Sequence, residues 1–594
     1  MTDYAAPVRD MSFVMEELIG LDTIAGLPGL DWVTEDLVRA VLAEAGRFGA
    51  EVLAPLNRVG DTQGCQLRNG VVTTPDGFAD AYRRFAEGGW NGTIAQPEYG
   101  GQGMPWLVAT AIGEIWDSAN LAFSLCPMLT QSAIWALSIH GSPEQKDTWL
   151  PRLVSGEWTG TMNLTEPHAG SDVGALRTRA VRDGEHYRIT GQKIFITWGE
   201  HDMAENIVHT VLARVDGAPE GTRGISLFIV PKYLVNPDGS LGSRNDLRCA
   251  ALEHKLGIHA SPTAVMSYGD DEGAIGYLVG EENRGMEYMF TMMNNARLGV
   301  GREGLAMAER AFQQARDYAG GRVQGRSIAD PAAGPVAIVR HPDVRRMLMT
   351  MKAEIEAMRA LSYVVAADLD VAGRHEDAEE RARRQARVDL LVPVVKAWCS
   401  DTGVAVASEA VQVHGGAGFI EETGAAQHYR DSRITPIYEG TNGIQALDLV
   451  RRKILGDRGA AVGDLIAEMD AFAGSAGGGA TAPIREALAD GVAALKDATG
   501  WLLDGRPAET CAAAATPYLA LLGTVVGGYL LARSAAIAEA KAEGADGDES
   551  FYRSKVETAR FYAECVLPRA ASLKRTAIGG AALLEGFDER RLWH

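Results

Sequence analysis

The amino-acid sequence predicts a mainly α-helical protein with a β domain inserted between its helical domains. Residues up to about 160 and residues after 285 repeat their apolar side chains at helical spacing, whereas the chain between them has short β-branched runs. The 594 residues, 46% of them hydrophobic, are enough for three or four domains with large cores. We expect the domains to span 1–160, 161–280, 281–455 and 456–594.

The N-terminal domain is expected to be helical. One apolar stripe recurs every three or four residues, as on the buried face of a helix: Leu37, Val41, Ala45, Phe48 and Val52. A loop-rich piece follows, with turn pairs at Pro75-Asp76 and Gly100-Gly101. The next helical run is interrupted at Gly141-Ser142-Pro143, where Ser142 has the position of a helix N-cap.

Four runs in the next part of the chain have the composition of β-strands. Each is rich in β-branched or aromatic residues and is bounded by Gly, Pro or Asp. The runs are YRITGQKIFIT, NIVHTVLAR, GISLFIVP and TAVMSYG. These runs predict the small β domain.

From Gly285 to about Leu455 the helical period returns. The first stripe is Leu305, Ala308, Phe312 and Ala315, and the second is Val344, Leu348, Met351, Ile355 and Met358. The near-heptad spacing of the second stripe is typical of a bundle core. Gly299–Gly304 matches the GxGxxG pattern, but no strand precedes it, so we expect close helix packing there and not a dinucleotide site.

The chain after Gly456 is again expected to be helical. A run without charged residues, Thr510 to Ala532, is long enough to span a bilayer. It is mostly Ala, Gly and Thr, and Pro517 and Gly523 interrupt it, so we favour a buried helix pair over membrane insertion. This part carries more acidic than basic residues, which disfavours a nucleic-acid-binding arm.

The overall charge and the cysteines limit the function classes. A net charge of −21 repels nucleic acid and anionic lipid and suits a cytoplasmic protein. Six scattered cysteines without any CxxC indicate reduced thiols. The sequence lacks the clustered His/Cys pattern typical of a metal site, so we do not expect a bound metal. The first residues carry several acids and no apolar run of signal-peptide length.

The stretch DSRITPIYEGTNGIQ, Asp431 to Gln445, carries a candidate catalytic acid. Glu439 stands between an aromatic residue and a glycine, with Ile437 and Ile444 nearby. A carboxylate among apolar groups loses hydration, so its pKa is expected to rise until it can take a proton from carbon near neutral pH. The alternative is an ordinary surface turn, since Glu-Gly and Asn-Gly are turn dipeptides.

Four further stretches have features that suit a cofactor. The loop Met162–Gly174 offers small polar groups and approachable backbone N–H groups, and KIFITWG could present an aromatic wall and a hydroxyl to a flat ring. The glycines of QVHGGAGF allow backbone close to a phosphate, and the arginines of GGRVQGR could pair with pyrophosphate. Each stretch alone also reads as a capped turn or a strand end.

In their order and spacing, these stretches resemble the signatures of the acyl-CoA dehydrogenase family. The matching segments are LTEPHAGSD, KIFITWG, QVHGGAGF and IYEGTNGIQ, and the resemblance covers residues 30 to 455. The remaining tail makes the chain similar to longer members, and FITWGEHD with the N-terminal extension resembles the subgroup for long-chain or 3-methylthiopropionyl-CoA substrates. The implied fold is a helical domain, a β-barrel or sandwich, a four-helix bundle and an extra C-terminal helical domain.

The resemblance implies that Glu439 is the base that removes the α-proton of an acyl thioester. In some members the base instead precedes an arginine that matches Arg297, and Ala296 at that position cannot act as a base. The implied cofactor is FAD. The matching contacts beside the flavin are Met162, Leu164, Thr165, Phe195, Ile196, Thr197, Thr441 and Gly443.

The resemblance also implies contacts farther from the flavin ring. Arg322, Gln412 and Gly416 match residues that reach the FAD of a neighbouring subunit, and Ser171 matches a contact to the CoA part of the substrate. The chain departs from the family pattern at Trp198, where many members have Asn, and at His414 and Ala417.

The activity implied by the resemblance is α,β-dehydrogenation of an acyl-CoA to trans-2-enoyl-CoA in a cytoplasmic homodimer or dimer of dimers. Electrons then pass to electron-transferring flavoprotein. Two alternatives remain: an acyl-CoA oxidase that uses oxygen, and a flavin-bearing nucleic-acid-binding protein of the same fold. The acidic tail argues against the second alternative, and no motif determines the acyl chain length.

Overall fold

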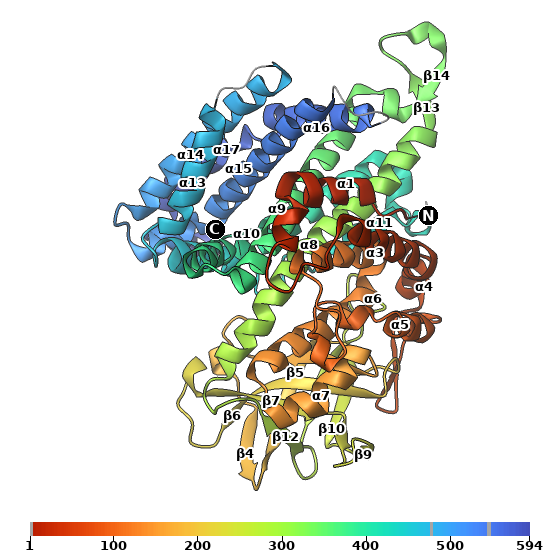
Figure 1. Ribbon diagram of the computed structural model, residues 1–594, viewed down its shortest axis with the longest axis vertical. Helices are drawn as coiled ribbons and strands as arrows, with labels where there is room; N and C mark the ends of the chain where they lie inside the picture. The colour runs from red at the N-terminus through yellow and green to blue at the C-terminus, as the bar shows by residue number, and fades with distance from the viewer. Residues whose placement is uncertain (1–3, 476–478, 543–547, 594) are drawn as a thin grey trace. The chain divides into compact units, whose positions relative to one another are not determined.

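The computed structural model describes residues 4–475, 479–542 and 548–593, and these form two compact units (Figure 1). Unit 1 comprises the described parts of residues 1–44, 106–114 and 300–594, and unit 2 comprises residues 45–105 and 115–299. Two long helices, α6 (Trp106–His140) and α8 (Gly285–Gly321), contribute residues to both units. The order of helices, strands and helices agrees with the predicted fold class.

Unit 2 is built around an eight-stranded sheet. Seven strands follow the order β10-β11-β5-β12-β7-β6-β3, and β4 pairs with both β5 and β6. The bounds are β3 Trp158–Asn163, β4 Arg179–Asp183, β5 His186–Thr197, β6 Asn206–Val215, β7 Ile225–Pro231, β10 Leu247–Leu252, β11 Thr263–Tyr268 and β12 Ala274–Leu278. All four predicted strand runs are therefore strands. Central strands β6 and β7 are buried along almost their whole length, because apolar clusters cover both faces of the sheet.

The helical part of unit 2 includes α4 (Ala54–Gln63), α5 (Phe78–Glu87) and α7 (Pro143–Ser155). The predicted N-cap is confirmed, since the Ser142 hydroxyl accepts from the Gln145 N–H and the Gln145 side chain accepts from the Ser142 N–H in a capping box. The N-terminal region, expected to be helical with a loop-rich piece, also contains one hairpin that we did not predict, β1 (Gln66–Arg68) and β2 (Val71–Thr73). Asn69 and Gly70 both have positive φ, as a two-residue hairpin turn requires.

Unit 1 is a helical bundle extended by the C-terminal helices. Its long helices α9 (Pro342–Arg374) and α10 (Ala378–His414) pack against each other and both contact α8. The hairpin β13 (Val323–Arg326) and β14 (Pro335–Ala337) connects α8 to α9. Shorter helices are α1 (Val8–Ser12), α2 (Leu21–Ala25), α11 (Ala425–Ser432), α12 (Asn442–Asp448) and most of α3 (Glu35–Phe48), whose last turn belongs to unit 2. The predicted α9 stripe is buried from Leu348 to Met358.

The GxGxxG segment packs helices together, as predicted. It lies inside α8, where a Cβ atom at Gly301 would come within 2.5 Å of Val395 and one at Gly304 within 2.5 Å of the Cys399 carbonyl oxygen. The two glycines therefore allow α8 and α10 to approach closely.

The C-terminal helices are α13 (Ala460–Gly474), α14 (Ala482–Leu503), α15 (Ala508–Ala542), α16 (Glu549–Cys565), α17 (Arg569–Arg575) and α18 (Ala581–Leu584). The uncharged run is one continuous helix, α15, and not the helix pair that we expected. Pro517 is accommodated inside it, and Gly523 lies against the ring of Trp398, where a Cβ would come within 2.4 Å.

Three helices of the described chain are long and apolar enough to cross a membrane: Trp106–His140, Ala378–Phe419 and Ala508–Ala542. In each, between 72% and 78% of the apolar window is buried against other parts of the protein. Their apolar faces are thus used in packing, which supports the buried interpretation of the C-terminal run.

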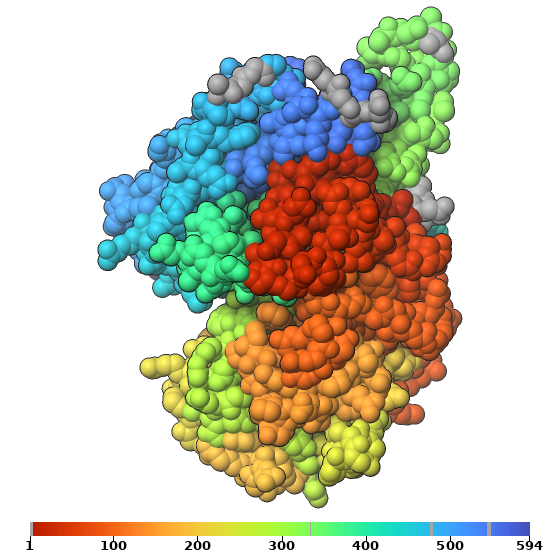
Figure 2. All heavy atoms as spheres, viewed as in Figure 1, coloured from red at the N-terminus to blue at the C-terminus, as the bar shows by residue number. Residues whose placement is uncertain are grey.

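A buried charge network joins the N-terminal residues to the bundle and to the C-terminal helices. Arg359 of α9 donates to Glu114, Glu309 and Asp10, and Lys555 of α16 donates to Asp10 and Glu356. Burial disfavours the charge of Asp10, but the cations of Lys555 and Arg359 outweigh it and hold the pKa of Asp10 below its usual range. Figure 2 shows the N-terminal residues, in red, against the blue C-terminal helices.

Candidate active site

Glu439 lies in the turn between α11 and α12, in a left-handed backbone conformation. Its φ is +55°, and Gly440 follows with φ +85°. A residue with a Cβ pays about 1–2 kcal/mol for this conformation. The side chain of Glu439 is half-buried. A strained residue of this kind persists only where its surroundings fix it, so the turn is not an ordinary surface loop.

Buried polar residues of α10 fix the start of α12. The ammonium of Lys396, fully buried, donates to Asn442 Oδ1 at 2.8 Å. The amide of Asn442 donates to the Ala397 carbonyl at 3.1 Å and to Ser400 Oγ at 3.0 Å. Thr441 caps α12, because its Oγ1 accepts from the Ile444 N–H at 3.3 Å.

The residues on either side of Glu439 are also anchored. Gln445 Nε2, fully buried, lies 3.3 Å from the Glu439 carbonyl oxygen and 3.4 Å from that of Gly440. The Tyr438 hydroxyl donates to Glu303, a fully buried carboxyl on α8. Sequence reasoning missed Lys396 and Glu303, because isolated residues on helices form no motif. It gave no role to Gln445, although that residue ends the DSRITPIYEGTNGIQ stretch.

In unit 2, the end of β3 and the strand β5 come together. The Ile194 N–H donates to the Thr165 carbonyl at 2.9 Å, and Thr161 Oγ1 donates to the Thr197 carbonyl at 2.7 Å. The structure therefore brings together two groups of predicted cofactor contacts. The first group is Met162, Leu164 and Thr165, and the second is Phe195, Ile196 and Thr197.

These predicted cofactor contacts differ in how far they are exposed. Phe195 has φ +59° and is 58% exposed, so its ring is available to a ligand. The hydroxyls of Thr165 and Thr197 are half-buried and make no hydrogen bond within the described part of the chain. Met162 and Ile196 are buried, so their side chains are not available at the surface.

Trp198 does not form the aromatic wall that KIFITWG suggested. The residue has φ +54°, is only 1% exposed, and its Nε1 donates to the Ala122 carbonyl at 3.2 Å. The positive φ of Phe195 and Trp198 turns the strand at this point, so Phe195, and not Trp198, presents its ring to the surface.

The remaining predicted contacts are exposed. Ser171 lies on the surface of the loop that follows β3. Gln412 and Gly416 lie at the end of α10, and Arg322 follows the end of α8. Tyr318, one helical turn before Arg322, stacks on His414 at 4.5 Å between ring centroids. Glu439, Thr441 and Gly443 share one turn in unit 1, whereas the β3 and β5 residues belong to unit 2.

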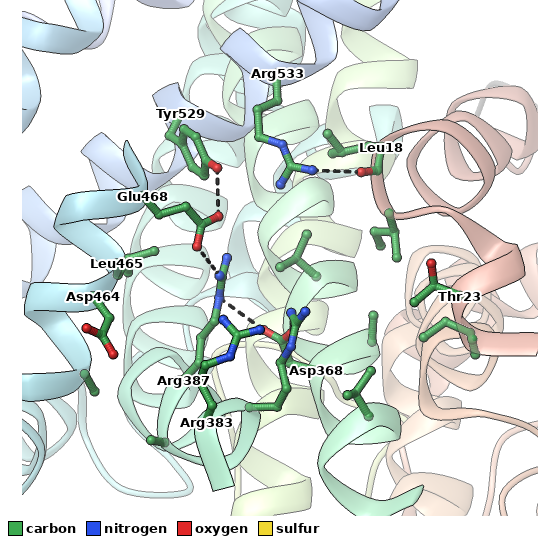
Figure 3. A pocket seen from close by; sticks show the side chains of 18 of the residues that line it. Leu18, Thr23, Asp368, Arg383, Arg387, Asp464, Leu465, Glu468, Tyr529 and Arg533 are labelled. Atoms are coloured by element: carbon green, nitrogen blue, oxygen red, sulfur yellow. Dashed lines mark hydrogen bonds and ion pairs between the residues drawn. The ribbon is translucent and has the colours of Figure 1, made fainter. Parts of the chain in front are cut away.

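A separate cavity of about 1090 Å³ lies within unit 1 and contains none of the predicted site residues (Figure 3). Its wall includes Asp368, Arg387, Glu468 and Tyr529, from α9, α10, α13 and α15. The charges are paired, since Arg387 lies 3.2 Å from Asp368 and 2.6 Å from Glu468, which also accepts from Tyr529. The candidate functional segments are therefore the Glu439 turn of unit 1 and, separately, the β3–β5 stretches of unit 2.

Models of acyl-CoA dehydrogenase domains match almost the whole chain. The N-terminal domain matches residues 36–157, the middle domain 161–270 and the C-terminal domain 283–454. A further model, described as acetyl-CoA dehydrogenase C-terminal like, matches residues 465–587.

Individual proteins agree with these matches. The chain is 48% identical to 3-methylmercaptopropionyl-CoA dehydrogenase of Ruegeria pomeroyi over 95% of this chain and 96% of that protein. A structure titled as electron transferring flavoprotein of Acidaminococcus fermentans has 27% identity and a TM-score of 0.58, covering 71% of this chain and 98% of that one. An acyl-CoA dehydrogenase of Bacillus anthracis complexed with FAD has a TM-score of 0.74 at 21% identity, covering 96% and 91%, and shows the fold alone.

The fold and the site thus define a flavin-dependent oxidoreductase that acts on acyl thioesters. The chain belongs to the acyl-CoA dehydrogenase family, as a longer member with an extra C-terminal helical domain. As a member of this family, the chain has FAD as its cofactor. The residues present fit this group, because β5 and the loop after β3 offer an exposed aromatic ring and two threonine hydroxyls that make no hydrogen bond within the described residues.

Proposed function

We propose that the protein oxidises an acyl-CoA thioester to the trans-2-enoyl-CoA, with Glu439 as the base. The observation that carries this proposal is the Glu439 turn, in which a strained carboxylate is held by anchors from α8 and α10. A base that must meet one carbon-bound proton benefits from such a fixed position.

In this mechanism Glu439 removes the α-proton of the thioester, and the electron pair of that bond forms the new double bond. The chemistry that bound FAD would supply is the acceptance of a hydride, which here would be the β-hydrogen with its electron pair. Negative charge develops on the thioester carbonyl oxygen as the proton leaves, and the backbone N–H of Glu439 is proposed as one of its hydrogen-bond donors. A half-buried carboxylate has partly lost its hydration, which favours proton uptake.

The other predicted residues receive cofactor and substrate roles in this proposal. Met162, Leu164, Thr165, Phe195, Ile196 and Thr197 are assigned to the flavin, with Thr441 and Gly443 following the base. Arg322, Gln412 and Gly416 are assigned to the FAD of a neighbouring subunit in a homodimer or dimer of dimers, which their exposure in one chain supports. Ser171 is assigned to the CoA part of the substrate.

The proposed substrate is 3-methylthiopropionyl-CoA or a longer acyl-CoA, in the cytoplasm. Its support is the 48% identity to a 3-methylmercaptopropionyl-CoA dehydrogenase over nearly the whole of both chains. Electron-transferring flavoprotein is the proposed electron acceptor. We also propose that the four domains have the boundaries 1–160, 161–280, 281–455 and 456–594.

Anaerobic mixing of the purified FAD-bound protein with a panel of acyl-CoA thioesters tests the proposal. We expect rapid bleaching of the flavin absorbance with 3-methylthiopropionyl-CoA and formation of one enoyl-CoA per flavin. Absence of bleaching with every thioester would reject the function. Steady peroxide formation in air at the turnover rate would reject electron-transferring flavoprotein as the acceptor and favour an oxidase.

A further inference from the structure

A buried ion pair lies directly behind the loop that follows β3. Lys193 of β5 is fully buried, and its Nζ donates to Glu166 Oε1 at 2.8 Å. Glu166 is 3% exposed. Burying both charges costs several kcal/mol per ion before their attraction is counted, and an apolar pair of the same volume is often as stable. Core stability alone therefore does not account for this pair.

The pair holds the backbone of the loop from two sides. Lys193 Nζ donates to the Leu164 carbonyl oxygen at 3.0 Å, and the next residue of the strand donates to the Thr165 carbonyl. Glu166 forms two backbone hydrogen bonds with Ala169 that close a tight turn. The carbonyl of Leu164 and the turn at Glu166 therefore both depend on the pair.

The carboxylate of Glu166 also ties the loop to β4 and the residues before it. Glu166 Oε2 accepts from the Arg177 N–H at 2.7 Å, and Glu166 Oε1 accepts from the N–H and the hydroxyl of Thr178 at 3.0 and 2.6 Å. His168 Nε2 lies 3.6 Å from Oε2. Lys193 lies on β5 together with Phe195 and Thr197. Its contacts therefore fix the positions of Leu164 and Thr165 relative to those two residues.

We propose that Lys193 and Glu166 are positioning residues for FAD, which set cofactor affinity by fixing the backbone of Leu164 and Thr165. The proposal rests on the proposed flavin contacts of these two residues. The pair acts through the loop and is not assigned a contact with the cofactor. The hydroxyl and backbone of Thr165 are presented correctly only while Lys193 holds the preceding carbonyl.

The charge state of the pair gives the proposal a pH dependence. Burial lowers the pKa of Lys193 to about 8, although the charge of Glu166 opposes this shift. Burial disfavours the charge of Glu166, but the ammonium of Lys193 outweighs it and lowers the pKa of that carboxyl. Among the described residues, one other titratable side chain faces the pair: His168, which is partly exposed and lies beside Glu166. As pH rises through 8, Lys193 loses its charge, so the ion pair with Glu166 is lost and the hydrogen bond to the Leu164 carbonyl weakens, and FAD affinity is expected to fall.

Three variants separate positioning from stability: K193M, E166Q and the double variant K193M/E166Q. K193M leaves Glu166 buried and unpaired by Lys193, so it is expected to lower the melting temperature, and the double variant removes both charges and should recover it. FAD affinity should not recover in the double variant, because the hydrogen bond to the Leu164 carbonyl is still missing. The expected loss is about 10- to 100-fold in FAD affinity, the effect of removing a charged hydrogen bond.

The measurement is FAD titration of the apoprotein, followed by flavin fluorescence, with melting temperature determined in parallel. K555M, which removes a buried lysine from the charge network of unit 1, is the matched control and should lower the melting temperature without weakening FAD binding. Titration of the wild type between pH 6.5 and 9.5 needs no variant and should show weaker binding above about pH 8.

Recovery of FAD affinity together with melting temperature in the double variant would overturn the proposal, as would wild-type affinity that stays constant through pH 8. Bleaching of the wild-type protein by acyl-CoA is measured first. If the wild type binds FAD and is bleached while the variants behave like K555M, the proposed function stands and only the role of Lys193 and Glu166 fails.

Discussion

The substitution N442A tests whether the anchors of the Glu439 turn serve catalysis. Asn442 accepts from Lys396 and donates to the Ala397 carbonyl and to Ser400, and the residue is 9% exposed. Three buried hydrogen bonds at about 1 kcal/mol each predict a loss of about 3 kcal/mol in the free energy of unfolding. A denaturant titration measures this loss.

The same substitution has a separate effect on rate. The left-handed conformation of Glu439 costs about 1–2 kcal/mol, so a released turn populates it about ten times less. We therefore expect the rate of flavin bleaching by acyl-CoA to fall about tenfold, with FAD content unchanged. N236A, a surface amide substitution in unit 2, is the control and should change neither quantity. A bleaching rate that stays at the wild-type level despite lost stability would refute the link between the anchors and the base.

Three further predictions concern stability. K555M should lower the free energy of unfolding by about 3–5 kcal/mol, because it leaves Asp10 with fewer buried partners; a loss below about 1 kcal/mol would contradict the buried network. Burial raises the pKa of Asp370, which caps α6, to about 7. The free energy of unfolding should therefore fall as the pH rises from about 4 to about 7, and D370N should remove up to about 4 kcal/mol of that pH dependence. The prediction would be refuted if denaturant titrations across this pH range gave the wild type and D370N the same dependence of unfolding free energy on pH. G523A should destabilise by about 1–3 kcal/mol, since its Cβ would overlap the ring packed there, whereas G500A on α14 has open space and should be neutral or stabilising; equal melting temperatures for the two variants would count against the packing.

The spacing of apolar residues predicted the large helices and strands, because side chains on the buried face of an element recur at that element's own period. The α9 stripe, the four strand runs and the capping box at Ser142 all follow from local patterns that the structure keeps. The Asn69-Gly70 hairpin carries the strongest two-residue turn signal, but its strands are three residues each, too short for an alternating pattern to appear. Pro517 led us to expect two helices in the uncharged run. The structure has one, because tertiary burial outweighs the local cost of a proline inside α15.

The site was predictable only where residues form a motif. Glu439, Thr165 and Phe195 lie in contiguous stretches, and the structure gives each an unusual environment: a left-handed turn, an unpartnered hydroxyl and an exposed ring. Lys396 and Glu303 anchor the turn from distant positions in the sequence, so tertiary structure alone reveals them. The burial of Trp198 depends on a positive φ that no sequence pattern encodes.

The role of Glu439 is tested most directly by E439Q. The amide keeps the size of the side chain but cannot accept the α-proton, so the yellow FAD-bound variant should lose flavin bleaching by acyl-CoA by at least about a thousandfold. E422Q, an exposed carboxylate on the surface near α11, should behave like the wild type. Full bleaching of E439Q at the wild-type rate would show that another group removes the proton.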